Sequence, residues 1–99
     1  LYHIPQYSGV PITLNVIQTL FKESGDTVIG IKDSEGNFSF IQDILTKFPG
    51  FNVFVGRESQ ISDAVKFGAI GAISGIANAY PELLCSLYEY GKDQQKPNR

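Results

Sequence analysis

The sequence predicts an α/β fold with parallel strands. Short apolar segments of strand character alternate four times with amphipathic helical segments along the 99 residues, without a linker or a change of composition. The apolar segments recur after about 20 to 28 residues, the length of one strand–helix unit in a parallel α/β barrel or a doubly wound sheet. They lack polar alternation, a pattern typical of parallel strands. We therefore expect one domain of four βα units over residues 1–91, followed by a polar tail over residues 92–99.

The first two units are identified by their apolar periods and helix ends. Residues 1–4 form the first predicted strand, and a helix follows near residues 14–24, where Gly25 ends it. Its apolar face comprises Leu14, Ile17, Leu20 and Phe21. The second strand covers residues 27–32, and Asn37 is placed to cap the next helix. The apolar face of that helix comprises Phe40, Ile41, Ile44, Leu45 and Phe48.

The last two units repeat this pattern. The third strand covers residues 52–55, and its helix begins near Ser59. The fourth strand covers residues 69–74, and its helix begins after Asn78 and ends at Gly91. The buried side of this last helix is expected to comprise Leu83, Leu84, Leu87 and Tyr88.

Composition and charge exclude several classes of partner and location. The formal net charge is −2 and no basic block is present, so neither nucleic acid nor an anionic membrane surface is an expected partner. No apolar stretch reaches about 18 residues, the length of a membrane span. The single cysteine, Cys85, lies in an apolar helical stretch and is expected to be a buried core thiol. Because no signal-peptide pattern opens the chain, a cytoplasmic location is expected.

Lys32 is the first candidate functional residue. It ends the second predicted strand, beside the small residue Gly30, which leaves room for a ligand. Parallel α/β sheets bind ligands at the carboxyl ends of their strands, so an amine at this point is well placed for function. A lysine that only extends its charge to solvent from a strand end would produce the same local pattern.

Tyr2 ends the first predicted strand and is expected on the same edge. Neighbouring strands lie about 4.8 Å apart, so the phenol of Tyr2 and the amine of Lys32 can reach one ligand. The pair suits imine chemistry, because burial favours the neutral amine that attacks a carbonyl. The phenol can relay a proton between the carbinolamine, the imine and the departing hydroxyl. A tyrosine that only packs at the strand end is the alternative.

Metal and nucleotide chemistry have little support in the sequence. His3 stands alone, and Asp33, Glu35 and Glu58 are scattered over different predicted loops, where solvated carboxylates are common. No metal site is therefore expected. The glycines do not form a phosphate-binding pattern after a strand, so no nucleotide site is expected either.

Four short segments together point to a known family. Residues 2–5 read YHIP, residues 30–37 read GIKDSEGN, residues 56–58 read GRE and residues 68–74 read GAIGAIS. In this order and spacing they resemble the Tyr-x-x-Pro turn, the Schiff-base lysine signature, the seventh-strand end and the eighth strand of one family. That family is the class I Schiff-base aldolases of the dihydrodipicolinate synthase and N-acetylneuraminate lyase type.

The resemblance implies a fold, a reaction and a set of site residues. It implies the C-terminal half of a (β/α)8 TIM barrel, strands five to eight with their helices, in a homo-oligomer that is a tetramer by the family pattern. Lys32 would form a covalent imine with pyruvate or another 2-oxo acid without a cofactor, and Tyr2 would move the proton. Gly56 and the main chain at Ile73 would line the pyruvate pocket, with Ser34 as a further substrate contact. Tight packing at barrel strand ends is the alternative for the pocket residues.

Tyr7 departs from the pattern of the dihydrodipicolinate synthases. Those enzymes usually carry an arginine two residues after the proline of the Tyr-x-x-Pro turn, where it meets the carboxylate of the second substrate. A phenol cannot replace a bidentate cation. The resemblance therefore favours cleavage of a 2-keto-3-deoxy sugar acid to pyruvate and an aldehyde, with Tyr7 near the substrate or packed on the next helix. Condensation of pyruvate with aspartate semialdehyde is the alternative reaction.

A role without catalysis belongs to another class of hypothesis. Barrels of this kind run to about 250 residues, and this chain opens within a strand without an initiator methionine, as if cut from a longer one. A half-barrel has two unpaired sheet edges and an exposed apolar inner face, so it could serve as an interaction module. The 99-residue piece alone is expected to be inactive.

Overall fold

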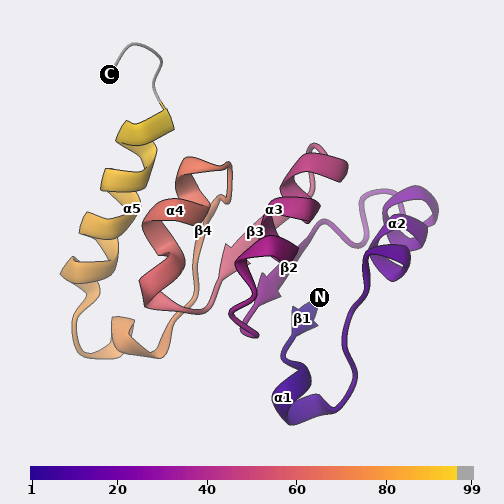
Figure 1. Ribbon diagram of the computed structural model, residues 1–99, viewed down its shortest axis with the longest axis horizontal. Helices are drawn as coiled ribbons and strands as arrows, with labels where there is room; N and C mark the ends of the chain where they lie inside the picture. Colours follow the sequence, from indigo (N-terminus) through magenta and orange to yellow (C-terminus); the bar gives the residue numbers. More distant parts are fainter. Residues whose placement is uncertain (96–99) are drawn as a thin grey trace.

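The computed structural model describes residues 1–95 and shows one parallel sheet with helices along it (Figure 1). The strands lie in sequence order, β1-β2-β3-β4, and each neighbouring pair is parallel. Their bounds are Tyr2–His3 for β1, Gly30–Asp33 for β2, Asn52–Val55 for β3 and Gly71–Ala72 for β4. The predicted α/β class with four parallel strands is confirmed.

Helical segments follow all four strands, as the βα repeat requires. Figure 1 shows α2, α3, α4 and α5 following one another across the view in sequence order. The α-helices are α1 (Pro5–Ser8), α2 (Leu14–Glu23), α3 (Phe38–Lys47), α4 (Ile61–Lys66) and α5 (Pro81–Gln95), and the 3₁₀ helices are η1 (Glu58–Gln60) and η2 (Gly75–Asn78). Polar residues precede both α2 and α3, and of the two only Asn37 was predicted from the sequence as a cap. Thr13 caps α2 by accepting from Val16 N at 3.3 Å, and Asn37 precedes α3 without a side-chain cap bond.

The core lies between the sheet and this helix layer. Its fully buried members alternate along the strands and recur along the helices, and they are Ile17, Ile31, Ile41, Ile44, Val53, Val55, Ile61, Ala64 and Val65. Alternate residues of a strand point to opposite faces, so the residues between them line the other face of the sheet. Ile73 on that face is 51% exposed, and Ile29, which lies before β2, is 60% exposed. In the described part of the chain, only the helix side of the sheet is covered.

The second strand begins three residues later than predicted. Its pairing starts at Gly30, whereas Thr27 to Ile29 form the approach to it. The carbonyl of Ile29 accepts from both the backbone and the side-chain nitrogen of Asn52, each at 3.0 Å. Ile29 is therefore exposed while Val28 packs against the core, which breaks the regular alternation expected before Gly30.

Helix α5 continues through Gly91 to Gln95, although Gly91 was expected to end it. Gly91 is buried against α4, where an added Cβ would lie 2.7 Å from the carbonyl oxygen of Ser62 and 2.8 Å from Cβ of Val65. Gly91 thus lets α5 approach α4 closely, and it does not end the helix. Residues 92–95 of the predicted tail belong to this helix, and residues 96–99 lie outside the described residues.

Cys85 is exposed, so its prediction as a core thiol was wrong. The side of α5 that meets the rest of the molecule comprises Leu84, Leu87, Tyr88 and Gly91. These positions follow the i, i+3, i+4, i+7 pattern of one helix face, and Cys85 lies outside that face. None of the helices within residues 1–95 is long and apolar enough to cross a membrane.

Candidate active site at the carboxyl ends of the strands

Strand register brings Tyr2 and Lys32 together. Tyr2 pairs with Lys32 across β1 and β2, and His3 pairs with Asp33. Backbone bonds of 2.9 Å from Lys32 N to the carbonyl of Leu1, and from Ser34 N to the carbonyl of His3, hold this register on both sides of the pair. The proximity predicted from the two strand ends is confirmed.

The amine and the phenol are in direct contact. Lys32 Nζ donates to Tyr2 Oη at 3.5 Å and lies 4.6 Å from the centroid of the tyrosine ring. Hydrogen bonds from the Ser34 hydroxyl and then from Lys32 lower the pKa of Tyr2 below its usual value, and the positive charge of Lys32 adds to this. A phenol in this setting gives up its proton more readily than a free tyrosine. The pair therefore holds a nucleophile and a proton carrier at one point.

Gly56 makes the room that these side chains occupy. It follows β3, and its nitrogen donates to the carbonyl of Asp33 at 2.7 Å. A Cβ at this position would lie 2.6 Å from the Ser34 hydroxyl and 3.4 Å from Cε of Lys32. Both predicted pocket residues, Gly56 and Ser34, thus lie beside Lys32.

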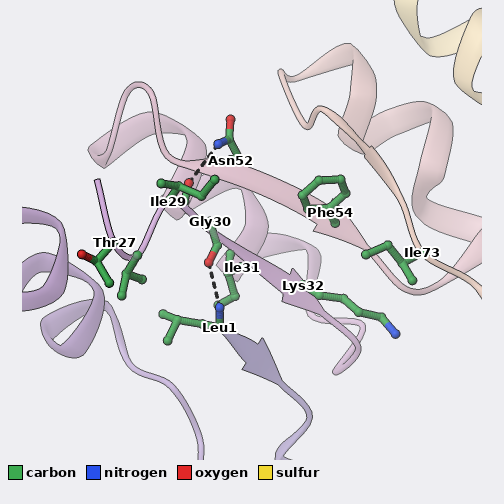
Figure 2. Close-up of a pocket in the computed structure, with 10 residues that line it drawn as sticks. Leu1, Thr27, Ile29, Gly30, Ile31, Lys32, Asn52, Phe54 and Ile73 are labelled. Carbon is green, nitrogen blue, oxygen red and sulfur yellow. Dashed lines mark hydrogen bonds between the residues drawn. The ribbon is translucent and has the colours of Figure 1, made fainter. Parts of the chain in front are cut away.

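Ile73 lines a cavity with Lys32 on the uncovered face of the sheet. Its nitrogen donates to the carbonyl of Val55 at 3.0 Å, which continues the pairing of the last two strands beyond β4. The cavity runs along this face and is also lined by Leu1, Ile29, Gly30, Asn52 and Phe54. Figure 2 shows Lys32, Phe54 and Ile73 along three neighbouring strand segments, with the lysine extending from the end of β2. Ile73 and Lys32 thus line one cavity, and the predicted contact of the Ile73 main chain with pyruvate stays a prediction.

Tyr7 stands apart from this group. It lies in α1 with 85% of its surface exposed. Among the interactions of residues 1–95, none joins its hydroxyl to Tyr2 or Lys32. Its predicted contact with substrate stays a prediction.

Sequence analysis missed a polar cluster, with two of its three members buried, next to Tyr2 and Lys32. His3 and Asp33 are 2% and 0% exposed, and one ligand atom from each of His3, Asp33 and Glu35 lies within 4.8 Å of the others. The expectation of an isolated histidine and scattered carboxylates was therefore wrong. Asp33 is the last residue of β2 and follows Ile31 by two positions, so it points to the core. The two-residue period of the strand was the signal in the sequence from which burial of Asp33 could have been predicted.

The hydrogen bonds of His3 argue against a metal at this cluster. Its Nδ1 accepts from the backbone N–H of Ile12 at 3.0 Å, so the proton of the neutral ring is on Nε2. Nε2 lies 2.9 Å from Glu35 Oε1 and donates to it. Neither nitrogen keeps a free lone pair, which a metal requires. The three side chains fit a hydrogen-bonded cluster better than a ligand set.

Asp33 contributes a buried carboxyl group to this cluster. Its Oδ2 accepts from Gly36 N at 3.3 Å, whereas its buried Oδ1 has no hydrogen-bond partner. Burial raises the pKa of Asp33 above its usual value, because the charged form is poorly solvated there. The cluster therefore favours the protonated form of this acid more than water does.

A second polar contact joins the ends of the last two strands. Ser74 donates to Glu58 Oε1 at 2.6 Å and also caps η2 by accepting from Ile76 N at 3.4 Å. The bond from Ser74 lowers the pKa of Glu58 and keeps it ionised. An acidic group thus follows β3 on the same edge of the sheet as Lys32.

Comparison with known proteins identifies the family of the chain. A model of the dihydrodipicolinate synthetase family matches residues 1–98. A DapA-like lyase of Chloroflexus aurantiacus is 36% identical over 89 residues, which cover 90% of this chain and 30% of the relative. The chain thus spans about a third of the length of such a relative.

Solved structures agree with the sequence relatives. Dihydrodipicolinate synthase from Agrobacterium tumefaciens superposes with a TM-score of 0.85 at 30% identity, covering 93% of this chain and 32% of that one. A prophage protein of the dihydrodipicolinic acid synthase family from E. coli, solved with pyruvate, has a TM-score of 0.83 at 26% identity, covering 96% of this chain and 33% of that one. With paired Tyr2 and Lys32 on four parallel strands and a family match over almost its whole length, the chain belongs to the dihydrodipicolinate synthetase family.

Proposed function

We propose that these residues form the C-terminal half of a (β/α)8 barrel that acts as a pyruvate-dependent class I aldolase. The observation that carries the proposal is the contact of 3.5 Å between Lys32 Nζ and Tyr2 Oη at the carboxyl ends of two adjacent strands. This is the edge at which barrels of this architecture bind substrate. The complex of the E. coli relative with pyruvate supports a 2-oxo acid as the substrate class.

The two side chains have separate parts in the proposed reaction. The neutral amine of Lys32 attacks C2 of pyruvate to give a carbinolamine, and the carbinolamine loses water to give a protonated imine. Tyr2 moves the proton to the departing hydroxyl, a task that its lowered pKa assists. In the cleavage direction, Lys32 forms the corresponding imine with the 2-keto-3-deoxy acid, and Tyr2 as the phenolate takes the proton of the C4 hydroxyl. The C3–C4 bond then breaks, its electron pair passes towards the iminium nitrogen to give an enamine, and the aldehyde leaves. Protonation of the enamine at C3 and hydrolysis of the resulting imine release pyruvate and restore the lysine. This cycle needs neither a metal nor an added cofactor.

The uncovered face of the sheet supports the proposal that a complete barrel is the working form. The cavity beside Lys32 is open in this chain, and Ile29 and Ile73 are exposed on the same face. Strands β1 and β4 each have one neighbour within residues 1–95, which leaves two edges for further strands. The homo-oligomer and the cytoplasmic location stay predictions of the sequence.

Gly56→Ala is expected to lower kcat/KM for pyruvate roughly tenfold or more in the full-length protein. The new methyl group would lie 2.6 Å from the Ser34 hydroxyl and 3.4 Å from Cε of Lys32, so both side chains must shift. Overpacking of this kind costs about 1–3 kcal/mol. Steady-state kinetics with pyruvate as the varied substrate measure the loss.

Gly75→Ala is the matched control for this substitution. A Cβ at Gly75 in η2 meets nothing within 4 Å, so the kinetic constants should stay close to wild type. Equal losses in the two variants would show that Gly56 has no special relation to Lys32.

The substrate we propose is a 2-keto-3-deoxy sugar acid. Tyr7 is the residue that supports this choice, because it offers a phenol where binding of a second carboxylate would need a fixed cation. The acidic group of Glu58 follows β3 on the same edge and disfavours a second anionic group there.

Condensation of pyruvate with aspartate semialdehyde is the alternative, and the name of the A. tumefaciens relative favours it. The two values of kcat/KM, for cleavage of 2-keto-3-deoxygluconate and for condensation with aspartate semialdehyde, decide between the reactions. We expect the first to exceed the second by about tenfold or more, because a lost bidentate ion pair costs on the order of 1.5–3 kcal/mol. A preference for the semialdehyde would assign the chain to the second reaction.

A further inference from the structure

His3 occupies an unusual position beside the catalytic pair. It follows Tyr2 in β1, so its side chain points to the opposite, helix-covered face of the sheet. The ring packs on Phe40 of α3 with centroids 4.6 Å apart. An apolar residue would fill this place without the cost of burying polar atoms. A buried imidazole is therefore explained by the hydrogen bonds that it makes.

Those hydrogen bonds join three separate parts of the chain. Nδ1 accepts from Ile12 N in the segment that leads to α2, at 3.0 Å, and Nε2 donates to Glu35 in the turn after β2, at 2.9 Å. The two bonds define one neutral tautomer, because a second ring proton would face the N–H of Ile12. His3 thus holds Glu35 from a fixed point on β1.

The turn that Glu35 belongs to also carries Ser34, whose hydroxyl lies beside Lys32: a Cβ at Gly56 would be 2.6 Å from this hydroxyl and 3.4 Å from Cε of Lys32. The hydrogen bond from Ser34 is the largest contribution that lowers the pKa of Tyr2. The backbone of Ser34 bonds to the carbonyl of His3 at 2.9 Å, and its carbonyl accepts from Gln6 Nε2 at 2.8 Å. The hydrogen bond between His3 and Glu35 is partly buried and holds the next residue of this turn.

We propose that His3 is a positioning residue for the proposed reaction: through Glu35 it holds the turn after β2, so that the Ser34 hydroxyl stays beside Lys32 and Tyr2. The inference rests on the proposed function, because it concerns the rate at which the Lys32 imine forms. When the hydrogen bond between His3 and Glu35 is lost, the turn after β2 shifts and the Ser34 hydroxyl moves away from Tyr2. Proton transfer to the departing hydroxyl then slows. The capacity of Lys32 to form the imine remains.

Two substitutions of His3 separate its two hydrogen bonds. In His3→Asn the side-chain oxygen can replace Nδ1 as the acceptor for Ile12 N, but the side chain is too short to reach Glu35. In His3→Gln the amide nitrogen can replace Nε2 as the donor to Glu35. Glu35→Ala removes the acceptor itself. Glu82→Ala, at an exposed glutamate in the first turn of α5, is the matched control.

The test measures both the rate and the extent of imine formation in the full-length protein. The protein is mixed with saturating pyruvate, borohydride is added after set times, and the reduced adduct is quantified by intact mass. We expect His3→Asn and Glu35→Ala to form the imine about ten- to a hundredfold more slowly, a range typical of a displaced catalytic group. Their final extent should equal wild type, and His3→Gln and Glu82→Ala should keep the wild-type rate.

The outcomes distinguish this inference from the function on which it rests. If the wild-type protein forms no imine, the proposed function fails and the inference fails with it. If wild type forms the imine but His3→Asn and Glu35→Ala keep its rate, only the inference is wrong. A reduced extent with an unchanged rate constant shows a role in stability alone and also overturns it. The double variant His3→Asn/Glu35→Ala should be no slower than either single variant, since both remove one bond.

Discussion

Lys32→Ala is expected to abolish trapping of pyruvate by borohydride and to reduce turnover of the full-length protein to background. The amine is the atom that bonds covalently to the substrate in the proposed cycle, and nothing in an alanine can replace it. Trapping with pyruvate should add the reduced adduct to the peptide that holds Lys32. Peptide mass spectrometry of the wild type and the variant measures this directly.

The control for this substitution is another lysine of the same domain. Lys47 lies exposed in the last turn of α3, and Lys47→Ala should be trapped and should turn over like the wild type. An adduct that persists in Lys32→Ala would place the imine on a different residue and would overturn the assignment of the nucleophile.

Tyr2→Phe is expected to slow turnover by about 10²- to 10⁴-fold, the range that general acid–base groups contribute. Phenylalanine keeps the ring that lies 4.6 Å from Lys32 Nζ, so the lysine should keep its place and pyruvate should bind nearly as well. What is lost is the hydroxyl that Lys32 contacts at 3.5 Å. The comparison of kcat with the dissociation constant of pyruvate, measured by titration, separates the two effects.

Tyr90→Phe is the control for removal of a hydroxyl group. Tyr90 lies exposed on α5, and its variant should have wild-type kinetics. If Tyr2→Phe turned over at the wild-type rate, Tyr2 would be a packing residue at a strand end, and another group would have to move the proton.

The order of elements could be predicted from local patterns because strands and helices leave periods in the chain itself. Apolar runs without polar alternation located all four strands, and amphipathic periods located the helices between them. The bounds were less certain, because they depend on pairing. The second strand starts at Gly30, directly after Ile29, whose carbonyl bonds to Asn52. The residues before Gly30 approach the sheet without regular strand pairing.

The proximity of Tyr2 and Lys32 could be predicted for a related reason. In a parallel sheet the strand ends meet at one edge, so Tyr2 and Lys32 had to be neighbours once both were placed at strand ends. The buried cluster of His3, Asp33 and Glu35 could not be predicted in the same way. His3 and Glu35 are 32 positions apart, and their bond depends on where the turn after β2 folds back.

The sequence by itself determined the βα order, the strand ends that carry Tyr2 and Lys32, and the family to which the chain belongs. Only the tertiary structure decided that Gly91 is a helix contact, that Cys85 is exposed and that His3 is bonded at both ring nitrogens. The physical reason is the range of the interactions. Periodicity is a property of neighbours along the chain, whereas burial and hydrogen bonding of a side chain depend on residues that only the fold brings close.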